Sequence, residues 1–322
     1  MEEKLVKILN EMADYLNISQ MKKLQETLLK NLAENEAKTE EIPNVEYLKM
    51  FIDAKQIEGC SERTLQYYRV TIEHMLGSIE TPIRKITTDE IRGYLVDYQK
   101  VNNCSKVTVD NVRRNMSSFF SWLEEEDYIL KSPMRRIHKI KTKQPVKETI
   151  TDEMIEKLRD NCTCVRDLAM IDLLYSTGIR VGELVGLNIS DIDFEERECI
   201  VFGKGDKERR VYFDAKAKLH LQEYIESRTD DNPALFVTLD APHARLKISG
   251  VEIRVRELGR KLNIDKIHPH KFRRTMATRA IDKGMPIEQV QKILGHSQID
   301  TTMQYAIVNQ NNVKVSHRRY IA

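Results

Sequence analysis

The chain contains 322 residues, with 52 lysines and arginines and 50 aspartates and glutamates, so its net charge is only +2. This length allows two domains and a small appendage. The near-balanced charge does not by itself indicate a nucleic-acid-binding protein, and no apolar run approaches the roughly 20 residues that cross a membrane. The N-terminal residues mix acidic and basic side chains too early for a secretory signal, so we expect a cytoplasmic protein.

The cysteines indicate neither a zinc site nor a disulfide framework. Their number, five, is odd, and no paired CxxC motif occurs. We therefore expect reduced thiols and no metal ion. His268 and His270 form an HxH pair, but no third ligand follows at metal spacing.

Helical spacing of apolar residues begins near the N-terminus. Leucine, isoleucine and methionine recur every three or four positions over residues 4–35, which leaves room for two helices. The polar run "NEAKTEEIPN" that follows ends in Pro-Asn and is typical of a linker. We therefore interpret residues 1–40 as a helical extension in front of the first domain.

Residues 45–140 are predicted to form a compact helical domain. Segments such as "NVEYLKMFIDAKQIEG" and "SKVTVDNVRRNMSSFFSWLEEEDYI" carry their apolar residues on one side. Ser61 precedes one segment as an N-cap, and Thr88, followed by acidic residues, opens another. Pro133 begins a short final turn.

A basic stretch follows this helical domain. Residues 131–147, "KSPMRRIHKIKTKQPVK", contain seven lysines or arginines and no aspartate or glutamate. A solvated linker and a strap lying along a phosphate backbone are equally compatible with this pattern. Residues 141–149 are the predicted link to the second domain.

Residues 150–322 are predicted to form a second domain of helices with a small β-sheet. Thr151 caps its first helix, and the next two helices are separated at Gly178. Alternating residues around the glycine-rich turn of "ECIVFGKGDKERRVYFD" predict a β-hairpin. Further helices follow over 269–284 and 286–295, so the fold class is mainly α with a small β-sheet.

Six polar residues of this domain stand where regular structure begins, ends or turns. Arg180 opens a helix with Glu183 one turn later, while His270 and Arg273 share one face at the start of another helix. Taken singly, each of these positions is typical of a surface side chain. In chain order the six residues are Arg180, Lys204, His270, Arg273, His296 and Tyr305.

The order of these residues resembles the tyrosine recombinases, the family of phage and transposon integrases and chromosome-dimer resolvases. The matching strings are "TGIRVGELVGL", "GKGDKERRV", "HPHKFRRTMATRA" and "ILGHSQIDTTMQYA". The resemblance covers the whole second domain, and the helical first domain fits the family's core-binding domain. Arg274 departs from the pattern, since many relatives carry a second histidine at that position.

The resemblance implies a bacterial enzyme that exchanges DNA strands, with Tyr305 as its nucleophile. A phenol can attack a phosphodiester once a neighbour takes its proton, and the phosphotyrosine conserves the bond energy, so no cofactor is expected. Charge then builds on the non-bridging phosphate oxygens, which Arg180 and Arg273 can hold with forked hydrogen bonds. The sequence offers no carboxylate cluster for Mg²⁺, so positive side chains take the place of a metal.

The remaining motif residues have proton-transfer or supporting roles in the family. Lys204, at the hairpin tip, is the candidate general acid for the leaving 5′-oxygen. His270 is the candidate general base or proton shuttle for Tyr305. His296 is expected to donate a hydrogen bond to the phosphate, and Glu183 to orient its neighbours without transferring a proton.

The first domain is expected to clamp DNA from the side opposite the catalytic domain. Helix starts and the basic stretch offer side chains for phosphate or base contacts, although a solvated helix face explains each of them equally well. The candidates are Ser61, Arg63, Thr64, Lys106, Arg113, Arg114, Arg135, Arg136, Lys139, Lys141 and Lys143.

The resemblance also implies assemblies on double-stranded DNA. One homodimer would bind two inverted half-sites, and two dimers would pair as a homotetramer that exchanges strands through a Holliday junction. The residues after Tyr305 would dock on the neighbouring subunit or pack within their own. An excisionase or a DNA-bending protein is a candidate accessory partner.

Integration and excision of a mobile element is the expected biological role, with DNA inversion for phase variation and chromosome-dimer resolution as alternatives. A relaxing enzyme similar to type IB topoisomerases is a more distant alternative, against which the core-binding domain argues. A non-catalytic DNA-binding regulator would need a broken motif, and here every motif position is filled.

Overall fold

The computed structural model describes residues 8–13, 15–37, 42–142, 148–203, 208–264, 266–305, 317–318 and 321. The chain divides into two compact units, Met1–Pro145 and Val146–Ala322. Within the described ranges, no helix is long and apolar enough to cross a membrane.

The N-terminal extension is helical over residues 8–12 and in α2 (Ile18–Ala37). Reciprocal bonds open α2: Asn17 Oδ1 accepts from the Gln20 N–H (2.9 Å), and Gln20 Oε1 accepts from the Asn17 N–H (3.0 Å). These bonds satisfy donors that a helix start leaves unpaired. Two helical stretches are therefore present, as the spacing of the apolar residues predicted.

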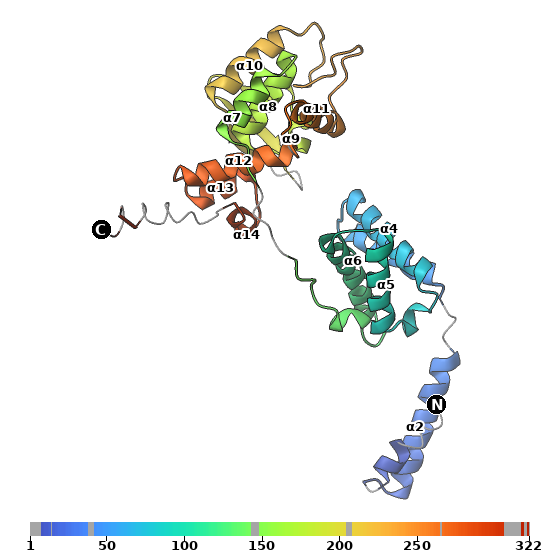
Figure 1. The fold of residues 1–322 in the computed structure, drawn as a ribbon. Helices are drawn as coiled ribbons and strands as arrows, with labels where there is room; N and C mark the ends of the chain where they lie inside the picture. Colours follow the sequence, from blue (N-terminus) through green and yellow to red (C-terminus); the bar gives the residue numbers. More distant parts are fainter. Residues whose placement is uncertain are drawn as a thin grey trace. The chain divides into compact units, whose positions relative to one another are not determined.

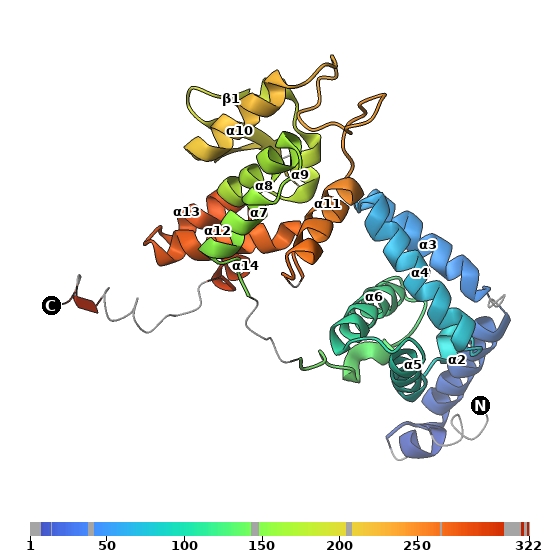
Figure 2. The ribbon, with the colours of Figure 1, turned by 45° about the horizontal axis from the view of Figure 1, so that its top comes forward.

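Helices α3 to α6 and two 3₁₀ turns form the body of the first unit (Figures 1 and 2). They are α3 (Asn44–Ile57), α4 (Glu62–Ser78), η1 (Ile83–Lys85), α5 (Thr88–Val101), α6 (Lys106–Glu125) and η2 (Pro133–Arg136). Ser61 caps α4, as predicted. The cap of α5 is Thr87 and not Thr88, because Thr87 and Glu90 form a capping box in which each side chain accepts from the other's backbone N–H.

Aromatic side chains fill the interior of this body. Phe51 of α3 meets Phe119 of α6 edge-on with ring centroids 5.2 Å apart, and Trp122 lies 5.6 Å from Phe51. Both phenylalanines are completely buried. Large aromatic side chains therefore fix α3 and α6 against each other.

Helices α7 to α14 belong to the second unit. They are α7 (Asp152–Asp160), α8 (Val165–Thr177), α9 (Val181–Gly186), η3 (Ile189–Asp191), α10 (Ala215–Glu226), α11 (Ile248–Lys261), α12 (Pro269–Asp282), α13 (Ile287–Leu294) and α14 (Ile299–Met303). Thr151 caps α7 and left-handed Gly178 ends α8, both as predicted. Pro286 precedes α13, which ends at left-handed Gly295, again as predicted.

An antiparallel sheet in the order β1-β2-β3 completes the described part of this unit. The predicted hairpin is present as β2 (Glu198–Phe202) and β3 (Glu208–Tyr212), whereas β1 (Ile192–Asp193) was not predicted. Two residues are too few to show an alternating pattern. Val201 lies opposite Arg209 in the register, which places Arg209 on the buried face of the sheet.

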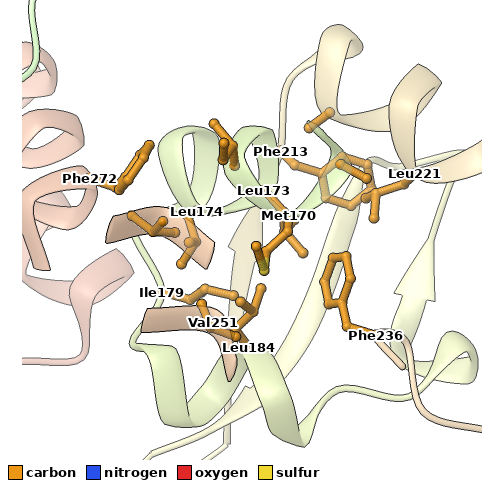
Figure 3. Packing of buried hydrophobic residues seen from close by; sticks show 14 of the residues in the cluster. Met170, Leu173, Leu174, Ile179, Leu184, Phe213, Leu221, Phe236, Val251 and Phe272 are labelled. Atoms are coloured by element: carbon orange, nitrogen blue, oxygen red, sulfur yellow. The ribbon is translucent and has the colours of Figure 1, made fainter. Parts of the chain in front are cut away.

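Helix α8 lies at the centre of the second core (Figure 3). It packs against α10 and α12. Its buried residues meet apolar side chains from the surrounding elements, and Figure 3 labels Met170, Leu173, Leu174, Ile179, Leu184, Phe213, Leu221, Phe236, Val251 and Phe272. Because the core surrounds α8, the end of this helix is a rigid point from which the next segment begins.

Candidate active site

Arg180 is held at the junction between α8 and α9. The left-handed turn at Gly178 (φ 64°) ends α8, and a Cβ atom there would overlap the Met276 side chain. The Arg180 N–H donates to Glu183 Oε2 (2.8 Å), and Arg180 Nη1 donates to Glu183 Oε1 (2.8 Å). Arg180 Nη2 reaches the Gly295 carbonyl oxygen at 3.3 Å, and the arginine side chain remains 37% exposed.

Glu183 is a buried carboxylate shared by two arginines. Arg209 of β3 donates from Nη1 to Oε1 (2.7 Å) and from Nη2 to Oε2 (2.6 Å), in addition to the bonds from Arg180. Burial acts to raise the pKa of Glu183, but hydrogen bonds from Arg209 and from the Arg180 backbone, with the charge of Arg209, bring it below its ordinary value. Glu183 is therefore ionised at neutral pH and suits an orienting role.

Arg273 of α12 lies deep in the site, with only 2% of its surface exposed. Its Nη1 donates to the Gly178 carbonyl oxygen (2.8 Å), and its Nη2 donates to the Leu294 carbonyl oxygen (2.6 Å). Burial and then the charge of Arg180 lower the pKa of Arg273 to about 10, so the side chain stays cationic at neutral pH. This buried guanidinium joins the end of α8 to the end of α13.

His296 follows the left-handed Gly295. Its Nε2 lies 2.9 Å from Arg273 Nη2, and its Nδ1 lies 2.8 Å from Thr302 Oγ1. A guanidinium can only donate, so Nε2 accepts and the ring proton resides on Nδ1, which donates to the Thr302 hydroxyl. Burial, Arg273 and Arg180 lower the pKa of His296 to about 4, so the ring is neutral at physiological pH.

Tyr305 lies beside His296 in the same chain. The two rings stack with centroids 6.0 Å apart, and Tyr305 packs against a small cluster that contains Val290 and Leu294. The Tyr305 N–H donates to the Thr302 carbonyl oxygen (2.9 Å). Thr302 therefore bonds to both residues, through its hydroxyl to His296 and through its carbonyl group to Tyr305.

The other predicted catalytic residues are placed differently. Lys204 lies in the segment 204–207, outside the described residues. His270 is exposed in the first turn of α12, on the same helix as Arg273. Arg274, which departs from the family pattern, donates from Nε to the Glu148 carbonyl oxygen (2.9 Å). Of the residues predicted from the sequence, the structure brings five into one network: Arg180, Glu183, Arg273, His296 and Tyr305.

Two residues of this network were not predicted from the sequence. Arg209 had a signal, because strand alternation puts it on the same side as buried Val211, and a buried arginine needs an acidic partner. No sequence pattern indicated Thr302, because its hydrogen bond to His296 depends on where α14 lies in the folded chain.

The network is suited to binding an anion. Arg180 and Arg209 bond to the single carboxylate of Glu183. Arg273 is close enough for its charge to interact with both Arg180 and Glu183, so the three guanidinium groups leave a net positive charge. Their forked donors match the oxygens of a phosphate. No cluster of three or more His, Cys, Asp or Glu side chains that would hold a metal ion occurs in the described part of the chain.

Two of the predicted DNA contacts in the first unit are engaged in ion pairs. Arg113 Nε donates to Asp110 Oδ1 (2.8 Å), with both side chains only 12% exposed. Arg135 Nη2 donates to Glu124 Oε1 (2.5 Å). Neither arginine is an unpaired surface cation, which a survey of basic residues in the sequence cannot reveal.

The remaining candidates of the first unit that the structure describes lie at the surface or in a helix cap. Ser61 and Thr64 bond each other through their hydroxyls (2.9 Å) at the start of α4. Lys143 lies outside the described residues. The exposed candidates are Arg63, Lys106, Arg114, Arg136, Lys139 and Lys141.

Two family models match this chain, one in each of its two units. The model of the phage integrase family matches residues 146–312, and the model of the N-terminal SAM-like domain of phage integrases matches residues 47–130. The tyrosine recombinase XerC of Oceanobacillus iheyensis is 30% identical over 290 residues, which are 85% of this chain and 95% of the relative.

Solved structures share the fold. The Tn1549 transposon integrase in complex with transposon right end DNA matches with a TM-score of 0.71 at 20% identity, over 86% of this chain and 99% of that one. The XerH recombinase bound to a palindromic difH substrate matches with a TM-score of 0.67 at 19% identity, over 97% and 93% of the two chains. The family model, the relative and the network of arginines, histidine and tyrosine agree: the chain belongs to the phage integrase family and is a tyrosine recombinase, an enzyme that cleaves and rejoins DNA.

Proposed function

We propose that this recombinase exchanges strands through a 3′-phosphotyrosine formed at Tyr305. The observation that carries the proposal is the stacking of Tyr305 on His296, which accepts a hydrogen bond from Arg273. A nucleophile beside a cationic pocket is the arrangement that phosphoryl transfer to a side chain needs. The Tyr305 oxygen attacks phosphorus, the bond from phosphorus to the 5′-oxygen breaks, and the reverse reaction on a second strand rejoins the DNA.

Arg180 and Arg273 hold the non-bridging oxygens of the scissile phosphate in this proposal. Charge-assisted hydrogen bonds strengthen as negative charge builds in the transition state. When a phosphate oxygen replaces His296 as the partner of Arg273 Nη2, the Thr302 hydroxyl can donate to His296 Nδ1. His296 Nε2–H then donates to the phosphate, so the expected role needs only a change of tautomer from the one that the bond to Arg273 requires.

Proton transfer is assigned to Lys204 and His270. Lys204 acts as the general acid that protonates the leaving 5′-oxygen, and His270 accepts or relays the proton of the Tyr305 hydroxyl. Glu183 takes no proton, because its pKa is lowered and its two oxygens already accept hydrogen bonds from arginines. It orients Arg180.

The assembly that we propose is a dimer on two inverted half-sites, with two dimers paired for exchange through a Holliday junction. The palindromic substrate of the XerH structure supports this symmetry. Exposed basic side chains of the first unit would then follow the phosphate backbone. The segment expected to dock on a neighbouring subunit, which begins after Tyr305, lies mostly outside the described residues.

Integration and excision of a mobile element is the biological role that we propose. The helical extension that precedes the SAM-like domain supports this role, because it is a segment additional to the two domains that cleave and rejoin DNA. Chromosome-dimer resolution is the second candidate, favoured by a likeness to XerC that spans 95% of the relative. Mapping the sites that the protein occupies in the chromosome separates them: the two ends of a discrete element support integration, and one site per chromosome supports resolution.

Replacing the nucleophile tests the chemical step. Wild-type protein first selects its binding site from a pool of random duplexes, and that site is built into a nicked suicide substrate that traps the covalent adduct. We expect Tyr305→Phe to bind the duplex and to form no adduct, while Tyr212→Phe, at an exposed tyrosine of the same unit, forms it normally. An adduct with Tyr305→Phe would disprove the assignment.

A further inference from the structure

Arg209 is the most heavily bonded residue around the candidate site that has no assigned role. Its side chain is 12% exposed, and it donates two hydrogen bonds to Glu183 at 2.7 and 2.6 Å. Its Nε donates to the Ile293 carbonyl oxygen (2.9 Å). Arg209 therefore links strand β3 to helix α9 and to the last turn of α13.

The carboxylate of Glu183 needs more than one cationic partner. Its side chain is only 4% exposed, and each of its oxygens accepts one bond from Arg180 and one from Arg209. A buried charge that loses a partner is strongly destabilised, so it draws the remaining partner closer. Without Arg209, Arg180 would be the sole arginine among the described residues with a hydrogen bond to this buried carboxylate, although the charge of Arg273 also acts on it.

Arg180 is also the more available of the two arginines. Its side chain is three times as exposed as that of Arg209, at 37% against 12%. The contact from its Nη2 to the Gly295 carbonyl oxygen is long, at 3.3 Å, and is the easiest of its bonds to exchange for a phosphate oxygen. Because Arg209 donates two hydrogen bonds to Glu183, Arg180 keeps donor capacity for a ligand.

We propose that Arg209 is a positioning residue, which neutralises Glu183 so that Arg180 can give its exposed guanidinium edge to the scissile phosphate. The inference rests on the proposed function, in which Arg180 binds that phosphate. Arg209 has a second anchoring contact, because its side chain fills the space in which a Cβ atom of Gly295 would lie. It thereby also holds the turn that precedes His296.

The test is a double-mutant cycle with Arg209→Met, Glu183→Gln and the double variant. Each full-length protein is measured for single-turnover adduct formation on the suicide substrate and, separately, for its Kd for the uncleaved duplex. We expect Arg209→Met to cleave about a hundredfold more slowly with an almost unchanged Kd, because a misplaced phosphate ligand affects the transition state most. The double variant should cleave about tenfold faster than Arg209→Met, since it lacks the buried charge that captures Arg180.

Arg210→Met is the matched control. Arg210 is the next residue on β3, but it points to the other face, pairs with Glu198 (2.7 Å) and is 62% exposed. We expect this variant to cleave within about threefold of wild type, because exposed ion pairs contribute little. A comparable loss with Arg210→Met would show that any damage to β3 slows cleavage, and would overturn the proposal.

Other outcomes are equally decisive. Cleavage by Arg209→Met within about threefold of wild type, a loss that appears entirely in Kd, or a double variant no faster than Arg209→Met would each contradict positioning through Glu183. If Arg209→Met does not fold, the double variant, which has no unpaired buried charge, still gives the comparison with Glu183→Gln. All rates are ratios to wild type, so they stay informative even if a residue other than Tyr305 forms the adduct.

Discussion

At the scale of single residues, His296 owes its charge state to its neighbours. Arg273 donates to its Nε2 and Thr302 accepts from its Nδ1. Both ring nitrogens therefore have a hydrogen-bond partner while the imidazole is neutral. Burial and nearby guanidinium groups lower its pKa to about 4. A neutral ring suits hydrogen bonding to a phosphate better than it suits acid catalysis at neutral pH.

Replacing His296 by glutamine tests this charge state. Between pH 6.5, its ordinary pKa, and pH 4, the unfolded chain binds a proton that the folded chain does not, so stability falls as the pH falls. From pH 7 to pH 5 we expect the free energy of unfolding of wild type to drop by about 1 kcal/mol more than that of His296→Gln, with solvent screening allowed for. Urea unfolding at both pH values measures this, and equal drops would show that His296 titrates normally.

At the scale of elements, the turn between α13 and α14 organises the site. Gly295 has φ 63°, and its carbonyl oxygen accepts from Arg180. The Arg209 side chain occupies the space beside its Cα, and His296 follows directly. The position requires glycine for two reasons, the left-handed backbone and the close approach of Arg209.

Gly295→Ala should therefore cost more than strain alone. Gly284 is the control, because it also has a positive φ (93°) but no atom within 4 Å of the position that a Cβ would take. We expect Gly284→Ala to lower the free energy of unfolding by about 1 kcal/mol and to leave cleavage unchanged. Gly295→Ala should lose roughly twice that stability and most of its cleavage rate, as measured by urea unfolding and adduct formation. Equal behaviour of the two variants would mean that contact with Arg209 is unimportant.

At the scale of the whole molecule, the two units have separate hydrophobic cores. Every buried residue of one cluster comes from the first unit and every buried residue of the other from the second. The tryptophan of the chain, Trp122, lies in the first core. Its fluorescence therefore reports on the first unit, whereas circular dichroism reports on the helices of both.

Core truncations should act on one unit at a time. Phe119 and Phe272 are both fully buried, one in each core. We expect Phe119→Ala to destabilise the first unit by about 3 to 5 kcal/mol and to shift the fluorescence transition in urea to lower concentration. Phe272→Ala should leave that transition in place and shift only the part of the circular dichroism curve that belongs to the second unit. A fluorescence shift with Phe272→Ala would show that the units unfold together.

The sequence by itself determined the helices, the β-hairpin of β2 and β3, and the order of the motif residues, whereas the two-residue strand β1 left no pattern. Ser61 and Thr151 cap their helices, and Gly178 and Gly295 end theirs, because caps and left-handed glycines act within a few residues. The Thr-x-x-Glu pattern of a capping box also distinguishes Thr87 from its neighbour Thr88, because Glu90 stands three residues after Thr87, so the misplaced cap of α5 is an error of sequence interpretation and not a tertiary effect.

Only the tertiary structure decided how the site is held together. Arg209 reaches Glu183 across 26 residues of sequence, and Arg273 reaches His296 across 23. The tautomer of His296 and the sharing of one carboxylate by two arginines follow from these contacts. They depend on distances between elements that pack around a common core, and no local pattern of residues encodes such distances.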